Sequence, residues 1–217
     1  FALMIGLAHR IVEADRFTRS GSYAGWSPTL LLGTDVHHKT LGIIGLGRIG
    51  HALAERAVEG FRMRCLYHTP HRDLAFEKEF GAQFASLPTL LAESDFVSVH
   101  VPLLPSTKHL ISTDELSLMK KTAYLINTSR GPIVDEKALL RALNTKRIAG
   151  AGLDVYECEP SIDCDLTDTL ALKCCTNVIL TPHTASATID TRQAMSRMAA
   201  ENIIAVLSGR TALNPAK

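Results

Sequence analysis

The segment TLGIIGLGRIG, residues 40–50, decides the fold because it joins a short apolar run to the glycine spacing G-x-G-x-x-G. The run ending at Ile44 is typical of a buried strand, and the residues after the glycines have helical periodicity. In this context Gly45 permits a tight turn, Gly47 lets the backbone approach a pyrophosphate, and Gly50 lets the helix pack closely on the strand. The segment therefore predicts a dinucleotide-binding turn, with the N–H groups of the helix start facing the phosphates. The alternative is an ordinary strand-to-helix turn that happens to contain glycines.

Outward from this segment, apolar stretches alternate with amphipathic ones. Further strands are expected near 62–67, 96–101, 123–127, 151–155 and 177–180. Helices are expected near 2–17, 49–60, 73–80, 87–93, 113–120, 135–145 and 187–208, with a polar connector over 18–35 that holds Trp26. Strands that are apolar throughout and separated by helices are typical of a parallel sheet covered on both faces. The pattern predicts an α/β protein, a Rossmann-type doubly wound parallel sheet with an extra helix at each end.

The composition limits the possible partners. The 217 residues are 46% hydrophobic and 21% charged, which permits a full-sized core and excludes a disordered or collagen-like chain. A formal net charge of +1 gives no reason to expect nucleic acid or an anionic membrane as a partner. No apolar run has the length of a membrane span, and the first residues lack the features of a signal peptide, so we expect a soluble cytoplasmic protein. Because residue 1 is Phe, we expect either processing or a chain that begins partway through a longer protein.

The cysteines and histidines give no sign of a metal site. The five cysteines are Cys65, Cys158, Cys164, Cys174 and Cys175. Their number is odd and their spacing fits neither a disulfide framework nor a zinc site, so reduced thiols are the favoured interpretation. The nine histidines are scattered, without thiolate or carboxylate support at ligand spacing. No metal is expected.

The end of the second strand bears on which dinucleotide is used. An NAD site places an acidic residue there, about 20 residues after the glycines, to bind the ribose hydroxyls. His68 stands in that position, no acid occurs before Asp73, and Arg72 is available to pair with a 2′-phosphate. The sequence therefore favours NADP(H) over NAD(H). The alternative is that both are solvated loop residues and NAD is used.

Three residues of catalytic type follow three of the predicted strands. Arg130 follows strand 123–127, Glu159 follows 151–155 and His183 follows 177–180, and the carboxyl ends of parallel strands share one edge. A forked guanidinium suits a substrate carboxylate, an imidazole suits a general acid, and a carboxylate can orient the imidazole and favour its charged form. Asp154 is placed to bind a nicotinamide carboxamide. The combination predicts hydride transfer to a 2-oxo acid, although each residue taken alone fits an ordinary loop.

Five segments in this order resemble the successive signatures of the D-isomer-specific 2-hydroxyacid dehydrogenases: TLGIIGLGRIG, HVPLLPSTKHLI, LINTSRGPIVDEKAL, AGLDVYECEP and LTPHTASAT. The segment GSYAGWSPTLLLGTD is most similar to the glyoxylate/hydroxypyruvate reductase branch, which often uses NADPH. The resemblance implies Arg130, Glu159 and His183 as catalytic residues. To the glycines, His68 and Arg72 it adds coenzyme contacts at Arg48, Ile49, Val101, Pro102, Thr107, Thr128, Ser129, Arg130, Asp154, His183 and Ala185.

The resemblance also implies a division of the chain. Residues 1–35 would form an interdomain helix and dimerisation arm, 36–186 an NAD(P)-binding Rossmann domain, and 187–217 a C-terminal interdomain helix with a truncated tail. The flavodoxin-like substrate domain of the family is expected to be missing, so that the isolated chain binds coenzyme without turnover. A homodimer formed through the coenzyme domain is expected. The expected function is reduction of glyoxylate, hydroxypyruvate or a similar small 2-oxo acid to the D-2-hydroxy acid, and the alternative is a corepressor-like protein that senses dinucleotides.

Overall fold

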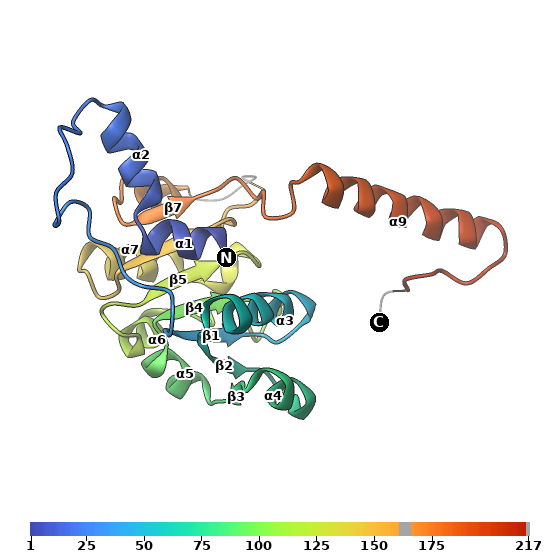
Figure 1. Cartoon of the computed structure of the whole chain (residues 1–217). Coiled ribbons are helices and arrows are strands. Elements are labelled where there is room, and N and C mark those ends of the chain that lie inside the picture. The colour runs from blue at the N-terminus through green and yellow to red at the C-terminus, as the bar shows by residue number, and fades with distance from the viewer. Residues whose placement is uncertain (161–165, 216–217) are drawn as a thin grey trace. The chain divides into compact units, whose positions relative to one another are not determined.

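The computed structural model describes residues 1–160 and 166–215, which fall into two compact units, Phe1–Pro182 and His183–Lys217. Within the described residues the first unit holds one seven-stranded sheet, with every pairing parallel and the order β3-β2-β1-β4-β5-β6-β7 (Figure 1). The strands are β1 (Thr40–Ile44), β2 (Arg64–His68), β3 (Gln83–Phe84), β4 (Phe96–Val99), β5 (Tyr124–Asn127), β6 (Gly150–Leu153) and β7 (Val178–Leu180). This arrangement confirms the predicted Rossmann-type doubly wound sheet.

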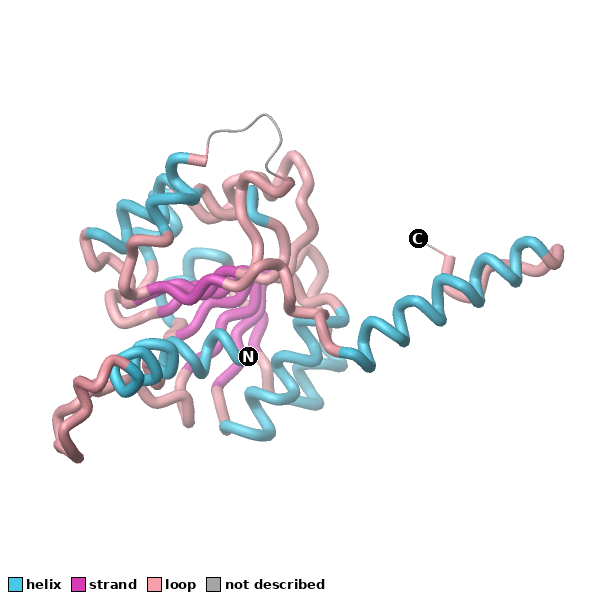
Figure 2. Tube along the Cα trace, turned by 90° about the horizontal axis from the view of Figure 1, so that it is seen from above, coloured by secondary structure: helices cyan, strands magenta, loops and turns pink. Residues whose placement is uncertain are grey.

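Helices cover both faces of the sheet (Figure 2). The helical segments of the first unit are α1 (Ala2–Ala8), α2 (Ile11–Arg19), α3 (Arg48–Glu55), a π-helical turn (Arg56–Gly60), α4 (Leu74–Phe80), α5 (Leu87–Glu93), α6 (Thr113–Leu118), a 3-10 turn (Gly131–Ile133), α7 (Glu136–Asn144) and α8 (Thr167–Leu172). Helices α1, α3 and α4 contribute to one apolar cluster and α5 to α8 to the other, because successive strand residues face opposite sides. Leu41 and Ile43 belong to the first cluster and Ile44 to the second.

The strand order reverses direction between β1 and β4. Ile44 at the end of β1 is aligned with His68 at the end of β2 and with Val99 at the end of β4. From β1 the chain proceeds through β2 and β3 toward one edge, and from β4 it proceeds through β5, β6 and β7 toward the other. Open α/β sheets bind ligands beyond the carboxyl ends of their strands at such a switch point. The glycine segment leaves β1 at this place.

The first helix departs from its prediction. The sequence predicts one helix over 2–17, but α1 ends at Ala8 and α2 begins at Ile11. Arg10 between them has a left-handed backbone with φ of 52°, and its guanidinium donates to Glu13 at 2.6 and 2.8 Å. The apolar spacing continues across this break, although Ile11 is 50% exposed. The sequence pattern predicts neither β3 nor α8.

The second unit is built on α9 (Ile189–Leu207), which confirms the predicted closing helix. The Thr188 hydroxyl caps it by accepting from the Thr191 backbone N–H at 3.2 Å. The segment after α9 is tied back to it, because the Asn214 N–H donates to the Asn202 side-chain oxygen at 2.9 Å.

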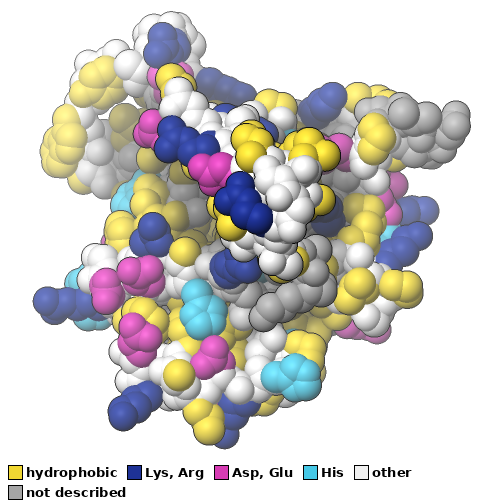
Figure 3. All heavy atoms as spheres, turned by 90° about the vertical axis from the view of Figure 1, so that its right-hand side faces the viewer, with side chains coloured by type: hydrophobic (Ala, Val, Ile, Leu, Met, Phe, Trp, Pro, Cys, Tyr) yellow, Lys and Arg dark blue, Asp and Glu magenta, His cyan; other side chains and the backbone are white. Residues whose placement is uncertain are grey.

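The surface carries charges of both signs. On the face drawn in Figure 3, basic side chains in dark blue and acidic ones in magenta are interspersed. Among the helices described, none has both the length and the apolar character needed to cross a membrane. Residues 1–160 and 166–215 contain no group of three or more His, Cys, Asp or Glu side chains able to hold a metal ion.

Cys158 is disulfide-bonded, which corrects the prediction of reduced thiols for that residue, while Cys65, Cys174 and Cys175 are free. Cys164 lies outside the described residues.

Candidate active site

The three glycines after β1 have three different surroundings. Gly45 has a φ of 95°, and a Cβ added there would lie 2.8 Å from backbone atoms of His100 and Val101. A Cβ on Gly50 would lie 2.7 Å from the Gly45 carbonyl oxygen, so this glycine lets α3 approach the strand. Gly47 begins α3 as its N-cap, and a Cβ there would meet nothing within 4 Å. The space in front of Gly47, next to a helix N-terminus, fits the pyrophosphate of a dinucleotide.

Arg48 and Ile49 form the first turn of α3 directly after this glycine. Both side chains are exposed, and Ile49 is 70% exposed although it is apolar. The predicted contacts at the start of α3 are therefore accessible to a bound molecule.

His68 lies beside the glycine loop. Its backbone carbonyl accepts from the Gly45 N–H at 2.8 Å, and its imidazole Nδ1 lies 3.0 Å from the Ala85 carbonyl oxygen. Arg72 lies further along the chain than His68 and forms an ion pair with Glu77. Its guanidinium donates to both Glu77 carboxylate oxygens, at 2.6 and 2.7 Å. Arg72, and then the Tyr67 hydroxyl, lower the pKa of Glu77 to about 2. A 2′-phosphate at this place would compete with Glu77 for Arg72.

The loop after β4 is held by hydroxyl groups. The Thr107 hydroxyl donates to the Pro102 carbonyl at 2.6 Å and accepts from the Leu104 N–H at 2.8 Å. The Ser129 hydroxyl donates to the Val101 carbonyl, so the loops after β4 and β5 are joined directly. Three predicted coenzyme contacts, Val101, Pro102 and Thr107, therefore lie in one ordered turn next to Gly45.

Asn127 at the end of β5 organises the turn that carries Arg130. It is only 1% exposed, accepts from the Ser129 N–H at 3.0 Å and donates to the Arg130 carbonyl at 2.9 Å. These bonds fix the backbone of Thr128, Ser129 and Arg130 and leave the Arg130 side chain exposed. Its guanidinium donates to the Ser129 carbonyl at 2.6 Å.

The loop after β6 packs against this turn. A Cβ on Gly131 would overlap the carbonyl of Tyr156, so the Arg130 turn and the Tyr156 backbone are in direct contact. Burial, followed by the charges of Asp154, Glu136 and Glu159, raises the pKa of the Tyr156 hydroxyl. Glu159 itself is exposed. The structure thus brings the Arg130 and Glu159 loops to the same edge of the sheet.

Asp154 lies below these exposed groups. It is 1% exposed, its N–H donates to the Asn127 carbonyl at 3.0 Å, and its carboxylate accepts from the Thr181 hydroxyl at 2.5 Å. The Tyr156 hydroxyl donates to the Thr181 carbonyl at 2.9 Å. Asp154 therefore joins the ends of β5, β6 and β7.

His183 and Ala185 belong to the second unit, whereas Arg130 and Glu159 belong to the first. His183 is exposed and has a positive φ of 55°. His183 follows the end of β7 at Leu180, as the sequence predicts.

Sequence reasoning missed Asn127, Thr181 and Glu136 as structural parts of the site. Only Asn127 has a signal in the local sequence, because an Asn side chain often accepts from the backbone N–H two residues further on and so favours a turn. Thr181 and Glu136 owe their roles to contacts with residues 27 and 21 positions away, which no local pattern records.

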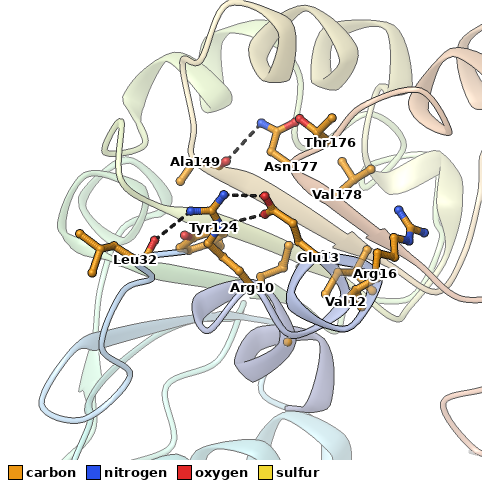
Figure 4. Close-up of a pocket in the computed structure, with 13 residues that line it drawn as sticks. Arg10, Val12, Glu13, Arg16, Leu32, Tyr124, Ala149, Thr176, Asn177 and Val178 are labelled. Atoms are coloured by element: carbon orange, nitrogen blue, oxygen red, sulfur yellow. Dashed lines mark hydrogen bonds and ion pairs between the residues drawn. The ribbon is translucent and has the colours of Figure 1, made fainter. Parts of the chain in front are cut away.

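Cavities lie at both ends of the strands. One of about 450 Å³, shown in Figure 4, is lined by Tyr124 at the start of β5, Asn177 just before β7, and the paired Arg10 and Glu13. It opens at the amino ends of the strands, away from the glycine loop. A second, of about 390 Å³, is lined by Leu103, Leu104, Pro105, Lys108, Pro132 and Glu157. The second lies among the loops at the carboxyl edge, where the chemistry is expected.

The chain matches known proteins over nearly all of its length. Residues 1–185 match the family model described as "D-isomer specific 2-hydroxyacid dehydrogenase, NAD binding domain". A glyoxylate reductase of Korarchaeum cryptofilum is 52% identical over 96% of this chain and 61% of its own length. A glyoxylate reductase of Thermococcus litoralis is 50% identical over 96% of this chain and 62% of its own length.

A solved structure has the same fold. The TT0316 protein of Thermus thermophilus superposes with a TM-score of 0.89 at 42% identity, covering 100% of this chain and 66% of that protein. The chain spans little more than three fifths of the length of the two glyoxylate reductases. A family model over 185 residues, supported by these identities, settles the family. The chain belongs to the D-isomer-specific 2-hydroxyacid dehydrogenases and contains their NAD-binding domain.

Proposed function

We propose that the protein reduces a small 2-oxo acid of the glyoxylate or hydroxypyruvate type to the D-2-hydroxy acid, with NADPH or NADH as hydride donor. The observation that carries this proposal is the carboxyl edge of the sheet. There the glycine loop contacts the loop after β4, that loop is bonded to the Arg130 turn, and the Arg130 turn contacts the loop that carries Glu159. The exposed side chains at this edge are of the types that the reaction needs. The identity of about half the residues to two glyoxylate reductases supports the same substrate class.

The coenzyme would be held by backbone and hydroxyl groups on both sides of the switch point. Gly47 and the first turn of α3 would receive the pyrophosphate, and the ordered turn at Val101 to Thr107 would border the nicotinamide half. When bound, the nicotinamide supplies the hydride that reduces the substrate carbonyl carbon. Asp154 would position the carboxamide from its place beneath the loop.

The chain's own side chains would handle the substrate charge and the proton. Arg130 presents a forked donor that can bind the substrate carboxylate and polarise the adjacent carbonyl. His183 would give a proton to the oxygen that becomes the hydroxyl, and Glu159 would favour the charged imidazole. These roles for His183 and Glu159 rest on the motifs in which they stand.

Steady-state oxidation of NADPH and NADH by the gene product that contains this chain tests the proposal, with glyoxylate and hydroxypyruvate as substrates. We expect turnover with at least one of the two acids, and a kcat lowered roughly 10²- to 10⁴-fold in His183→Asn. Glu159→Gln should shift the alkaline limb of the pH profile. Tight coenzyme binding without turnover would instead favour the dinucleotide-sensing alternative. The 217-residue chain assayed beside it should bind coenzyme and turn over slowly or not at all.

We further propose that NADP(H) is preferred, since the end of β2 carries His68 and Arg72 and no acid. Arg72→Ala should raise KM for NADPH and leave KM for NADH nearly unchanged. Arg64→Ala is the matched control, because Arg64 is also paired to a glutamate, at 2.8 Å, and begins the strand that His68 ends, about 13 Å away. A higher kcat/KM for NADH than for NADPH in the unaltered protein would refute the preference.

We also propose that the protein forms a homodimer through the coenzyme domain, with the arm at residues 18–35 at the interface. Trp26 is 83% exposed, Leu32 65% and Tyr23 50%, an unusual amount of apolar surface for one connector. Sedimentation of Trp26→Asp should show more monomer than the unaltered chain. Leu118→Asp, at an exposed leucine on α6, is the control and should leave the oligomeric state unchanged. A monomeric unaltered chain would refute the proposal.

A further inference from the structure

A buried carboxylate lies under the proposed catalytic edge and takes no part in the chemistry proposed above. Glu136, the first residue of α7, is only 4% exposed. Its carboxylate accepts from the Glu157 backbone N–H at 2.6 Å and from the Thr169 hydroxyl. Burial raises the pKa of this carboxyl. Burying a carboxylate costs free energy unless its oxygens accept hydrogen bonds. The burial of Glu136 therefore suggests that its side chain has a specific role.

Capping of α7 does not supply that reason. The helix already has an N-cap in Asp135, whose carboxylate accepts from the Ala138 N–H at 2.9 Å and from the Ser112 hydroxyl at 3.0 Å. The Glu136 side chain instead forms its bonds away from its own helix, with the loop after β6 and with α8. The Glu136 side chain therefore links α7 to α8 and to the loop after β6, and we call this set of contacts, between Glu136, Glu157 and Thr169, the brace.

The contacts between Glu136 and Glu157 are reciprocal, and they join the start of α7 to the loops after β4 and β6. The Glu136 N–H donates to one Glu157 carboxylate oxygen at 3.3 Å, and the other Glu157 oxygen lies 2.5 Å from His109 Nε2. His109 belongs to the loop after β4, Glu136 follows β5, and Glu157 follows β6. The loops that carry the proposed site are thereby fastened at one place.

Glu136 holds the chain close to Glu159. Glu157, whose backbone N–H donates to the Glu136 carboxylate, precedes Glu159 by two residues. The Thr169 hydroxyl holds the Glu136 carboxylate itself, so this carboxylate fixes the chain directly before the residue proposed to orient the general acid. Misplacing a catalytic group by about 1 Å lowers rates on the order of 100-fold, so such fixation has a measurable effect.

We propose that Glu136 is a positioning residue that holds Glu159 in place by fixing the backbone at Glu157, an inference that rests on the proposed function. The Glu136 side chain is buried and bonded within the protein. It acts through the Glu157 backbone and the Thr169 hydroxyl.

The test compares Glu136→Ala, Glu136→Gln and Thr169→Val in the complete gene product, with Lys137→Ala as the neighbouring exposed control. Glu136→Ala should lower kcat roughly 10- to 100-fold, leave KM for the coenzyme within about twofold and shift the alkaline limb of the kcat pH profile. Glu136→Gln should recover most of kcat, because its amide oxygen still accepts from Glu157. Thr169→Val should fall between the two.

Two results would overturn the inference. One is a Glu136→Ala enzyme with the kcat and pH profile of Lys137→Ala, which would make Glu136 merely structural. The other comes from hydrogen exchange on the 217-residue chain: residues 155–160 should exchange faster in Glu136→Ala, and unchanged exchange there would remove the brace. If the unaltered protein reduces no 2-oxo acid, the proposed function fails, and the exchange measurement still decides whether the brace exists.

Discussion

Gly45 and Gly47 lie two residues apart in one motif, and the structure predicts opposite consequences for the same substitution. In Gly45→Ala the new Cβ would lie 2.8 Å from His100 and Val101 backbone atoms, on a backbone with φ of 95°. Unfavourable φ and overpacking each cost about 1–3 kcal/mol, so the variant should lose roughly 2–6 kcal/mol. For a chain of this size, that corresponds to a Tm lower by roughly 5–20 °C.

In Gly47→Ala the new Cβ meets nothing within 4 Å, and φ is an ordinary −97°. The loss at the N-cap should stay below about 1 kcal/mol. The methyl group would nevertheless project toward the place where a pyrophosphate approaches the backbone. Losing one hydrogen bond to a charged group costs about 1.5–3 kcal/mol, which raises the coenzyme Kd roughly 10- to 150-fold.

Thermal melts without coenzyme and fluorescence titration with NADPH and NADH measure the two effects on the same preparations. Gly45→Ala should mainly lower Tm, whereas Gly47→Ala should raise the coenzyme Kd and leave Tm nearly unchanged. Equal Tm losses in the two variants would refute the assignment of Gly45 to the tight turn. An unchanged Kd in Gly47→Ala would refute the pyrophosphate site at α3.

Two further predictions concern titrating groups. Burial raises the pKa of the Cys65 thiol to about 12. Iodoacetamide at pH ~8 should therefore leave Cys65 unmodified in the folded chain and alkylate the exposed Cys174, which mass spectrometry can measure. Labelling of native Cys65 at the rate of Cys174 would contradict its burial. Because the pKa of Glu77 is depressed to about 2 by Arg72, the stability it contributes is present above the ordinary carboxyl pKa of 4.5 and is lost as pH falls toward 2. Tm measured across that window should fall less steeply in Glu77→Gln than in the unaltered chain, and parallel slopes would exclude the linkage.

The sequence was sufficient for the central strands β1, β4, β5 and β6 because these are buried on both faces. A segment such as FVSV in β4 has no exposed face, and this largely apolar character is readable without a structure. The same signal is absent from β3, whose two residues Gln83 and Phe84 are both exposed. The break at Arg10 was also invisible, because the apolar spacing runs through it and the left-handed residue is not a glycine.

In the candidate site, the motifs predict which loops carry the functional residues but not the burial or the bonding partner of each side chain. The sequence suggests a phosphate partner for Arg72, yet Arg72 pairs with Glu77, five residues on, a spacing that does not lie on one helix face. Glu136 resembles an acid placed in the first turn of a helix for its dipole, which would be exposed. Only the packing of α7 against the loop after β6 buries it. Partner choice of this kind depends on tertiary contacts.

Burial separates two classes of residue that the motifs list together. Gly47, Arg130 and Glu159 are exposed at the carboxyl edge, where they can meet a coenzyme or a substrate. Asn127, 1% exposed, belongs to the same motifs but binds the backbone groups that hold the Arg130 turn. A motif therefore contains residues of two kinds, those able to contact a ligand and those that support the contacting loop. Because the motif alone does not separate the two kinds, assigning a role to any one position requires its burial and its bonds.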